Sequence, residues 1–151
     1  MPERRSRDIA VNRRAFHDYF VDETYEAGMA LTGTEVKSLR AGRVNLRDGF
    51  VRIDGNEAWL ENVHISPYVQ GGYVNHDPLR RRKLLLHADE IASLTGKVRQ
   101  RGYTLIPLRM YFSGNHAKVE VGLCRGKRQY DKREAIAERD ARRQMERALR
   151  R

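Results

Sequence analysis

Apolar and polar residues alternate along most of the middle of the chain, and this period of two predicts antiparallel β-strands. The clearest case is a pair of segments, 103–112 and 117–124, which we expect to form a hairpin across the turn at 113–116. In the first segment Pro107 falls on the face opposite the apolar residues, which indicates an edge position or a bulge. The apolar face of the two segments consists of Thr104, Ile106, Leu108, Met110, Phe112, Ala117, Val119, Val121 and Leu123.

Further segments with strand character complete the picture of a mainly β protein. A second hairpin surrounds the turn at 54–56, residues 16–31 are rich in Tyr, Phe, Val and Thr, and residues 82–87 give another short strand. Four or more antiparallel strands with short helices between them favour a small barrel of the oligonucleotide-binding (OB) type, although a β-sandwich stays open. The connection 66–78 is long for a structureless loop, which predicts a functional or partly ordered surface segment.

Helical periodicity occurs in two short stretches of the body. Residues 33–41 are predicted to form a helix with Thr34 as its N-cap and Gly42 as its stop. Residues 88–101 place apolar side chains three and four positions apart and are predicted to form a second helix that ends before Gly102.

Charge divides the chain into three parts. Residues 125–151 hold 11 Lys/Arg against 5 Asp/Glu, and residues 1–14 hold 5 against 2. The 110 residues between them are nearly neutral, with 14 basic and 13 acidic side chains. We therefore expect a flexible basic N-terminus at 1–8, a barrel domain at 9–124 and a basic C-terminal tail at 125–151. A folded body with basic arms is typical of proteins that bind a polyanion, most often RNA or DNA.

The tail allows two interpretations. It could be a disordered, solvated appendage, or it could become a helix on binding, because a thin apolar stripe recurs every four residues through Ala137, Ala141, Met145 and Leu149. That stripe is too weak to hold a helix in free solution. We expect a tail that is disordered when free and helical inside a polyanionic groove.

Candidate RNA contacts on the body fall into local groups. Residues 80–83 form a basic run in which Arg80 and Arg82 share one strand face while Arg81 and Lys83 share the other. A second basic group comprises Lys37, Arg40, Arg43 and Arg47. Among the aromatic residues near the N-terminus, Phe16 and Phe20 are predicted to lie in the core, and His17 and Tyr19 on the outer face, where they could stack on bases.

Catalysis is not favoured by any motif. The five histidines are scattered, and no metal-ligand spacing, phosphate-binding loop or nucleophile motif occurs, so we expect neither enzyme activity nor a cofactor. The single cysteine, Cys124, excludes an intramolecular disulfide; Arg125 beside it could lower its pKa, but the alternation makes it an ordinary outward strand residue. The absence of an apolar leader and of any long apolar run favours a cytoplasmic protein.

Five segments of the chain resemble one bacterial family: IAVNRRAFHDYF, YEAGMALTGTEVKSLRAGRVNL, NHDPLRRRKLLLH, KVRQRGYTLIPLRMYF and GKRQYDKRE. They are similar to the SsrA-binding protein (small protein B) family, and the resemblance runs from about Ile9 to the end. It implies an OB-like barrel that binds the tRNA-like domain of transfer-messenger RNA (tmRNA, or SsrA RNA) in trans-translation. It also implies a tail that enters the empty mRNA channel and decoding centre of the small ribosomal subunit, with indirect links to elongation factor Tu and alanyl-tRNA synthetase. The protein would be a monomer that performs no chemistry itself.

The resemblance also implies which residues bind RNA. On the body the implied set is Asn12, Arg13, His17, Tyr19, Glu26, Lys37, Ser38, Arg40, Arg82, Lys83 and Leu85. In the tail the implied ribosome contacts are Gly126, Lys127, Arg128, Tyr130, Asp131, Lys132 and Arg133. The chain has Gly126-Lys127-Arg128 where GKK is common in the family, and Arg keeps the charge.

Two other functions are compatible with the same charge layout. One is a structural ribosomal protein with basic extensions, which would accompany every subunit, whereas an adaptor would be substoichiometric. The other is an RNA-modifying enzyme that uses a His/Asp pair, for which no cofactor motif speaks.

Overall fold

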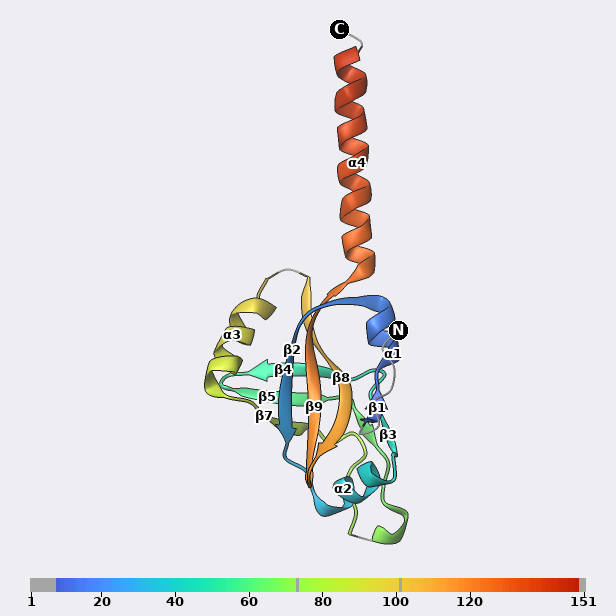
Figure 1. Ribbon diagram of the computed structural model, residues 1–151, viewed down its shortest axis with the longest axis vertical. Coiled ribbons are helices and arrows are strands. Elements are labelled where there is room, and N and C mark those ends of the chain that lie inside the picture. Colours follow the sequence, from blue (N-terminus) through green and yellow to red (C-terminus); the bar gives the residue numbers. More distant parts are fainter. Residues whose placement is uncertain (1–7, 73, 101, 150–151) are drawn as a thin grey trace.

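The computed structural model describes residues 8–72, 74–100 and 102–149, and for residues 71 and 128–138 it describes the backbone alone. Nine of the fourteen elements in the described residues are strands, and their arrangement is shown in Figure 1. In chain order the elements are β1 (Asp8–Val11), α1 (Arg13–Asp18), β2 (Tyr19–Met29), α2 (Gly33–Arg40), β3 (Val44–Asn45), β4 (Phe50–Asp54), β5 (Glu57–Glu61), β6 (His64–Ile65), the 3₁₀ turn η1 (Val69–Gly71), β7 (Arg82–Leu85), α3 (Ala88–Val98), β8 (Tyr103–Ser113), β9 (His116–Gly126) and α4 (Lys127–Leu149).

Six antiparallel strands close into a ring in the order β4-β5-β7-β2-β9-β8, and β8 returns to β4. Strand β8 pairs with β9 along one edge, and along its other edge with β4 at Leu105 and with β1 near Met110. Closure leaves no long open edge among the described strands, which is how small antiparallel barrels avoid pairing with other chains. The expected mainly β, antiparallel architecture with short helices is confirmed. The short β3 and β6 pair outside this ring.

The barrel interior holds the main hydrophobic core. Strand β9 contributes Ala117, Val119, Val121 and Leu123, as its alternation predicted, and both predicted hairpin turns are present between β4 and β5 and between β8 and β9. The β8–β9 turn passes through Gly114 at φ 62°, a left-handed conformation that glycine adopts without strain. Leu39 of α2 and Leu94 of α3 are fully buried in the same core.

Strand β8 departs from the predicted single apolar face because it contains a bulge. The register shifts between Pro107 and Arg109, so the bulge that Pro107 indicated is present, in a strand that is paired on both sides. One extra residue exchanges the two faces of a strand. Leu105 before the bulge and Met110 after it therefore face the main core, whereas Ile106 and Leu108 face outward.

Helix α1 covers these outward residues and corrects the prediction of an extended segment from residue 16. Ala15 of α1 packs with Ile106, Leu108 and Cys124 in a second small core outside the barrel. The extended structure begins only at Tyr19. The prediction that Phe16 and Phe20 lie in the barrel core is also wrong: Phe16 is half-buried against the second core, and Phe20 is 36% exposed.

Cys124 belongs to this second core and is fully buried, so it is not an outward residue available to solvent. Burial, helped by the Asp22 carboxylate, raises the pKa of its thiol to about 12, the opposite of the lowering that Arg125 could have caused. We expect the folded protein to react very slowly with iodoacetamide at pH 8, because only the thiolate attacks. The measurement is the alkylation rate followed by mass spectrometry; a Ser113→Cys variant, exposed at the β8–β9 turn, is the fast-reacting control. A rate equal to that of the control would contradict the buried position.

The helices α2 and α3 form where they were predicted, with different ends. The N-cap of α2 is Thr32, not Thr34: its hydroxyl accepts from the Glu35 backbone N–H at 3.4 Å, and the Glu35 carboxylate accepts from the Thr32 N–H at 2.9 Å. This reciprocal pair is a capping box, which fixes the start of the helix. Gly42 follows the helix at φ 73°, as a stop should, and α3 ends at Val98, three residues before the predicted end.

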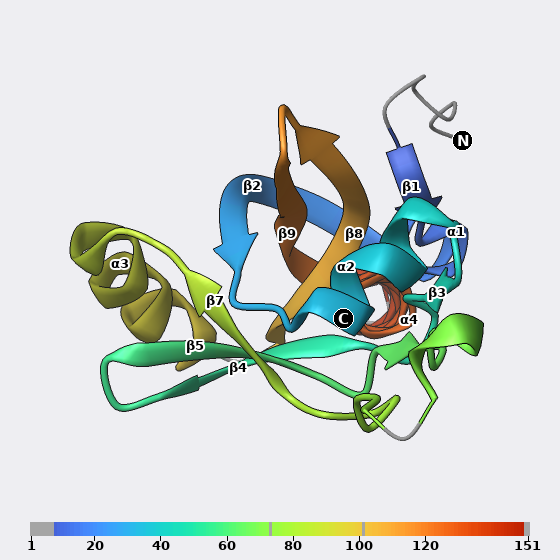
Figure 2. The ribbon, with the colours of Figure 1, turned by 90° about the horizontal axis from the view of Figure 1, so that it is seen from below.

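The basic C-terminal segment is a single helix, α4, that begins immediately after β9 and extends away from the barrel (Figure 1). Viewed from below, α4 is seen end-on behind α2, so the two helices lie at opposite ends of the barrel (Figure 2). The structure has the helical form of the tail, and disorder in the free protein stays a prediction. No described helix is long and apolar enough to cross a membrane. Residues 1–7 of the predicted flexible N-terminus lie outside the described residues, whereas Asp8 begins β1.

Candidate nucleic-acid interface

Helix α1 is held in place by Asn12, the first residue of the implied RNA-binding set. The Asn12 side chain is buried: its oxygen accepts from the Ala15 N–H at 3.2 Å, and its nitrogen donates to the carbonyls of Pro107 at 3.0 Å and Leu46 at 3.2 Å. Both polar atoms of this amide are thus used, to cap α1 and to tie it to β8 and to the segment before β4. Asn12 positions the helix and does not face solvent.

The outer side of α1 presents the next two members of the set. Arg13 is exposed, and the His17 side chain is 77% exposed with its Nδ1 2.8 Å from the Asp18 carboxylate. That contact and Arg14 lower the pKa of Asp18, so this carboxylate is ionised near neutral pH. Tyr19 is half-buried against the second core, which leaves part of its ring at the surface.

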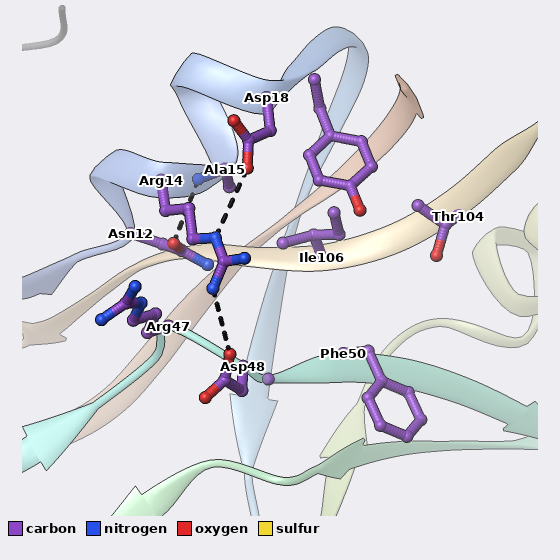
Figure 3. Close-up of a pocket in the computed structure, with 11 residues that line it drawn as sticks. Asn12, Arg14, Ala15, Asp18, Arg47, Asp48, Phe50, Thr104 and Ile106 are labelled. Carbon is purple, nitrogen blue, oxygen red and sulfur yellow. Dashed lines mark hydrogen bonds and ion pairs between the residues drawn. The ribbon is translucent and has the colours of Figure 1, made fainter. Parts of the chain in front are cut away.

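A cavity of about 290 Å³ lies between α1, β8 and the start of β4 (Figure 3). Arg14 reaches across its mouth between Asp18 and Asp48, at 3.4 Å from each carboxylate. The walls combine apolar and polar side chains, and the lining residues are Asn12, Arg14, Ala15, Asp18, Tyr19, Arg47, Asp48, Gly49, Phe50, Thr104 and Ile106. Two arginines and two aspartates balance their charges here, so the cavity itself is not a cationic phosphate site.

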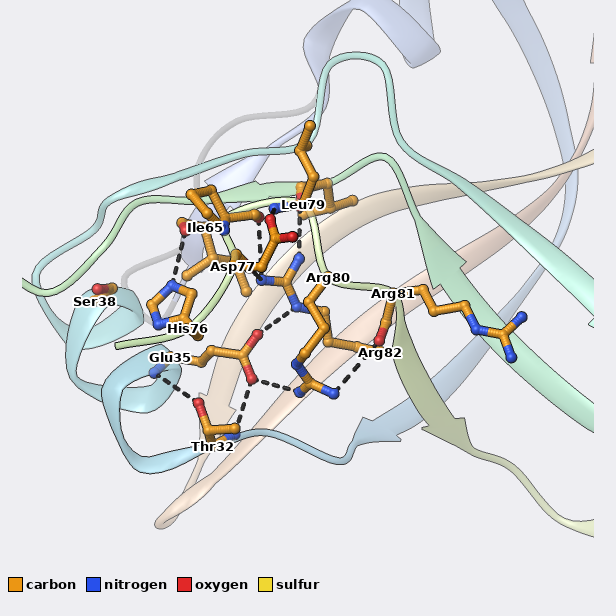
Figure 4. A network of polar contacts seen from close by, with 12 residues as sticks. Thr32, Glu35, Ser38, Ile65, His76, Asp77, Leu79, Arg80, Arg81 and Arg82 are labelled. Carbon is orange, nitrogen blue, oxygen red and sulfur yellow. Dashed lines mark hydrogen bonds and ion pairs between the residues drawn. The ribbon is translucent and has the colours of Figure 1, made fainter. Parts of the chain in front are cut away.

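At the other end of the barrel a buried ion-pair network joins α2 to β7 (Figure 4). The Glu35 carboxylate is fully buried and accepts from Arg82 Nε and from an Arg80 terminal nitrogen, each at 2.5 Å. The Arg82 guanidinium, 1% exposed, also donates to the Val63 carbonyl at 2.7 Å and the Pro78 carbonyl at 3.1 Å. Arg82 therefore cannot touch RNA in this structure. It fastens the loop before β7 and the helix α2 to one carboxylate.

The protonation states of this network are set by burial and hydrogen bonding in opposite directions. Burial alone would raise the pKa of Glu35, but hydrogen bonds from Arg80, the Thr32 backbone and Arg82 outweigh it and hold the pKa below 4.5. Burial lowers the pKa of the Arg82 guanidinium more than Glu35 raises it, yet a guanidinium stays charged at neutral pH. Both partners are therefore ionised, and each depends on the other for its charge to be tolerated in the interior.

Two further contacts fix the loop 66–78 against α2. Ser38 is buried and its hydroxyl donates to the Ser66 carbonyl at 2.7 Å. His76, also buried, lies with Nδ1 2.9 Å from the Thr34 hydroxyl and Nε2 2.9 Å from the Ile65 carbonyl. The loop is thus partly ordered, as its length suggested, and Ser38 acts inside the fold.

Lys37 and Arg40 lie on the exposed side of α2, as their spacing predicted. The Lys37 ammonium is 5.5 Å from the centre of the Tyr68 ring, and the Arg40 guanidinium is 5.9 Å from that of Phe112. Both cations are therefore positioned by aromatic neighbours while their charge faces solvent.

The remaining body residues lie on the outer surface of β7, β2 and β9. Leu85 is 56% exposed and pairs with Gly28, whose missing side chain leaves room for it: a Cβ there would be 3.3 Å from the Leu85 Cβ and 3.7 Å from Lys118 Nζ. Glu26 accepts from the Tyr111 hydroxyl, and Lys83 reaches Glu57 at 3.4 Å. Leu85, Glu26 and Lys118 thus form one continuous surface across three strands.

Two features of this surface were not found from the sequence. Lys118 alternates with the apolar residues of β9, but only the strand order β7-β2-β9 brings it beside Leu85. The Arg81 guanidinium lies 4.0 Å from the centre of the Trp59 ring, from the neighbouring strand. The prediction of strand faces for the run 80–83 is confirmed. Arg80 and Arg82 both bind the Glu35 carboxylate, while Arg81 and Lys83 lie on the opposite face of the strand.

The implied residues therefore fall into separate places, not one patch. Asn12, Arg13, His17 and Tyr19 lie at the end of the barrel near the start of α4, and the α2 residues lie at the opposite end (Figure 1). Gly126 is the last residue of β9 and Lys127 the first of α4. The side chains of Arg128, Tyr130, Asp131, Lys132 and Arg133 lie outside the described residues. Among the side chains that are described, no three His, Cys, Asp or Glu residues are grouped to hold a metal ion.

Comparison with known proteins identifies a family that this chain matches. Residues 9–151 match the SmpB protein family. The chain belongs to the SmpB (SsrA-binding protein) family. An SsrA-binding protein of Roseiflexus sp. (strain RS-1) is 63% identical over 144 residues, which are 95% of this chain and 91% of that protein. The SsrA-binding protein of Bacillus cytotoxicus is 56% identical over 99% of this chain and 97% of its own length.

A solved structure agrees with this SmpB assignment in three dimensions. A chain of the structure described as "tmRNA-SmpB: a journey to the center of the bacterial ribosome" is similar to this chain with a TM-score of 0.68 and 55% identity. The likeness covers 84% of this chain and 93% of that one. The family resemblance read from the sequence segments is confirmed.

Proposed function

We propose that this protein is a tmRNA-binding adaptor that rescues stalled ribosomes in trans-translation and performs no chemistry itself. The observation that supports it best is the 63% identity, over 95% of the chain, to a protein named SsrA-binding protein. The similar solved structure, whose description names tmRNA, SmpB and the bacterial ribosome, supports the same partners.

The barrel, in this proposal, is an OB-type module that holds the tRNA-like domain of tmRNA. Direct contacts come from the exposed members of the implied set, namely Arg13, His17, Lys37, Arg40, Lys83 and Leu85, to which the structure adds Lys118 as a candidate. The buried members, Asn12, Ser38 and Arg82, act by holding α1, α2 and the loop before β7. Glu26, which accepts from Tyr111, shapes the surface between them.

The helix α4 is the part proposed to enter the empty mRNA channel and reach the decoding centre. Its residues 127–149 hold 8 Lys/Arg against 5 Asp/Glu, so it is attracted to an RNA-lined channel. The side chains of residues 139–149 are exposed and do not cover the barrel. The protein would work as a monomer in the cytoplasm, with elongation factor Tu and alanyl-tRNA synthetase as indirect partners.

A structural ribosomal protein and an adaptor differ in two measurable properties. These are whether binding to the ribosome requires tmRNA, and how many copies bind per ribosome. We expect the purified chain to bind tmRNA and its isolated tRNA-like domain with similar affinity, and to cosediment with ribosomes only in substoichiometric amounts that require tmRNA. Fluorescence anisotropy and sedimentation measure the two quantities. One copy on every ribosome without tmRNA would favour the structural ribosomal protein.

A matched pair of variants tests whether the exposed cations contact phosphate. Arg40→Ala is expected to weaken tmRNA binding and to lower the slope of log K against log salt by about 1. Arg52→Ala removes another exposed arginine, from β4 and outside the proposed surface, and should leave the slope unchanged. Equal slopes for the two variants would remove Arg40 from the interface.

A further inference from the structure

The cavity between α1, β8 and the start of β4 combines a partly apolar interior with a charged mouth (Figure 3). Its volume of about 290 Å³ is close to the lower limit for sites that hold small organic ligands. Ala15 and Ile106 belong to the second core and give the cavity an apolar wall. Tyr19 follows α1 and Phe50 begins β4, so two aromatic side chains line the cavity from two different elements. Phe50 is 42% exposed, so burial in the barrel core does not account for its position.

Arg14 holds the mouth of the cavity with two weak contacts. Its Nε lies 3.4 Å from the Asp18 carboxylate, and a terminal nitrogen lies 3.4 Å from the Asp48 carboxylate. Both distances are long for a charge-assisted hydrogen bond, and all three side chains are at least 42% exposed. Exposed ion pairs of this kind contribute little stability, so the contact with Asp48 can break at small cost. Arg14 would stay on Asp18 and leave the Asp48 carboxylate and its own terminal nitrogens available to a ligand.

The groups at the mouth favour a ligand with donors and acceptors on the edge of a planar ring. The Asp48 carboxylate accepts hydrogen bonds and the Arg14 guanidinium donates them. Guanine is the nucleobase that offers two adjacent donors, N1–H and the N2 amino group, to the two oxygens of one carboxylate. Its O6 and N7 atoms are the acceptors with which arginine pairs most often. Adenine, cytosine and uracil each have a single donor group on that edge, so they would satisfy the carboxylate less well.

The charges around the cavity suit a base better than a phosphate group. Asp18 and Asp48 offset Arg14 and Arg47 within the lining, so an anion gains little by entering. Arg47 is exposed, as is Arg13 on the neighbouring α1, so cations are available outside the cavity for the phosphates that flank an inserted base. Unpaired bases of RNA are commonly bound in this way, by stacking on aromatic side chains and by hydrogen bonds to their edges.

We propose that this cavity binds the base of an unpaired guanine in RNA. The ring lies between Tyr19 and Phe50. Asp48 accepts from N1–H and the N2 amino group, and Arg14 donates to O6. Asp18 is a positioning residue, because it retains Arg14 while Asp48 changes partner. This inference deepens the proposed function and rests on it for the source of the guanine, which is either tmRNA or the RNA of the small ribosomal subunit.

Titration with free nucleotides tests the cavity without any partner. Guanosine monophosphate, added at millimolar concentration to the full-length chain, should shift the NMR signals of the backbone amides of residues 48–50 and 104–106. The adenosine, cytidine and uridine monophosphates should bind roughly tenfold more weakly. Unshifted cavity amides, or equal affinity for all four nucleotides, would overturn the guanine site.

Three variants assign the contacts. Phe50→Ala should weaken binding of guanosine monophosphate roughly tenfold, because a stacking surface is lost. Asp48→Asn should lower the affinity for guanosine monophosphate and raise it for adenosine monophosphate, because an amide presents the donor and acceptor that adenine matches. A merely structural role for Asp48 would lower both. Asp54→Asn removes an exposed carboxylate at the other end of β4 and should change neither affinity.

Kethoxal, which modifies N1 and N2 of unpaired guanines, identifies the source of the base in assembled complexes. With protein in excess, one guanine in tmRNA or in small-subunit RNA should be protected by the unaltered chain and by Asp54→Asn. It should react again with Asp48→Asn and with Phe50→Ala, and the RNA in which it lies is the source. If neither RNA contains such a guanine although the chain binds both, an RNA base is not the occupant and the proposal falls. If the chain binds neither tmRNA nor ribosomes, the proposed function falls, whereas the nucleotide titration still decides on the cavity.

Discussion

A chain that ends at Gly126 should bind tmRNA about as well as the full-length chain and should support no tagging on stalled ribosomes. Gly126 is chosen as the last residue of the truncated chain because β9 remains paired with β2 up to Gly126. Ending the chain earlier would remove Cys124 from the second core and Arg125 from its ion pair with Asp22. None of the described side chains of α4 belongs to the barrel core, so the truncated domain should keep its stability.

The same truncation separates the charge of the C-terminal tail from the charge of the body. The truncated chain loses 10 Lys/Arg and 5 Asp/Glu, yet the exposed cations of the body stay in place. If α4 makes no contact with the tRNA-like domain, both the affinity at fixed salt and its salt dependence should be almost unchanged. Anisotropy titrations at several salt concentrations measure this, and an in vitro tagging assay measures function.

A full-length variant controls for the loss of length. Asp131→Ala, Lys132→Ala and Arg133→Ala together keep α4 and change only residues carried over from the family motif. This variant should also bind tmRNA normally and fail to tag. Loss of tmRNA binding in the truncated chain would contradict the division of labour between barrel and tail, and normal tagging by it would contradict any role for α4.

The strands could be predicted because their pattern is local, and the helix near the N-terminus could not. Alternation assigns β9 and its inward residues correctly, since each residue reports only the face on which it lies. In β8 the bulge at Pro107 exchanges the faces, so the predicted inward face is right for Met110 and wrong for Ile106 and Leu108. The prediction of an extended segment from residue 16 fails because the Asn12 side-chain oxygen caps a helix there, while its amide nitrogen is held by carbonyls 34 and 95 residues away. Such long-range hydrogen bonds leave no local pattern.

Prediction of the candidate site is limited in the same way, by contacts between residues far apart in the chain. The run 80–83 indicates cations and predicts which of them share a face, but not which face is buried. That depends on Glu35, 47 positions from Arg82 in the chain, which draws Arg80 and Arg82 inward and leaves Arg81 beside Trp59. The resemblance supplies Arg82 as a functional residue, and the structure gives it a physical role, as an interior tie.

Removing the charge of Glu35 should be the most destabilising single change in the body. Glu35→Gln keeps a side chain that can cap α2 but leaves the buried Arg82 guanidinium without a carboxylate, a loss of about 3–5 kcal/mol. For a domain of this size that corresponds to a fall in Tm of roughly 10–20 °C. Thermal unfolding followed by circular dichroism measures it. Glu57→Gln, which breaks the exposed pair with Lys83, is the control and should change Tm little.

The dependence of this effect on pH identifies its cause. Because the pKa of Glu35 is lower in the folded protein than its usual 4.5, its ionised form stabilises the fold above that pH. The stabilisation is lost as pH falls below 4.5 towards the folded pKa, so the gap in unfolding free energy between the unaltered chain and Glu35→Gln should narrow there. A gap that stayed constant from pH 7 to pH 3 would mean that packing, not charge, explains the loss.

Substitution of Arg82 tests whether its side chain stabilises the interior of the fold or contacts RNA. Arg82→Lys keeps the charge but cannot reproduce a fork that binds Glu35 and the carbonyls of Val63 and Pro78 at once. We expect a large fall in stability, and normal tmRNA affinity when binding is measured well below the Tm of the variant. Arg40→Ala should show the opposite: unchanged stability and weaker binding. If Arg82→Lys lost affinity while fully folded, with α2 in place, the guanidinium would have to reach RNA, which requires the network around Glu35 to open when tmRNA binds.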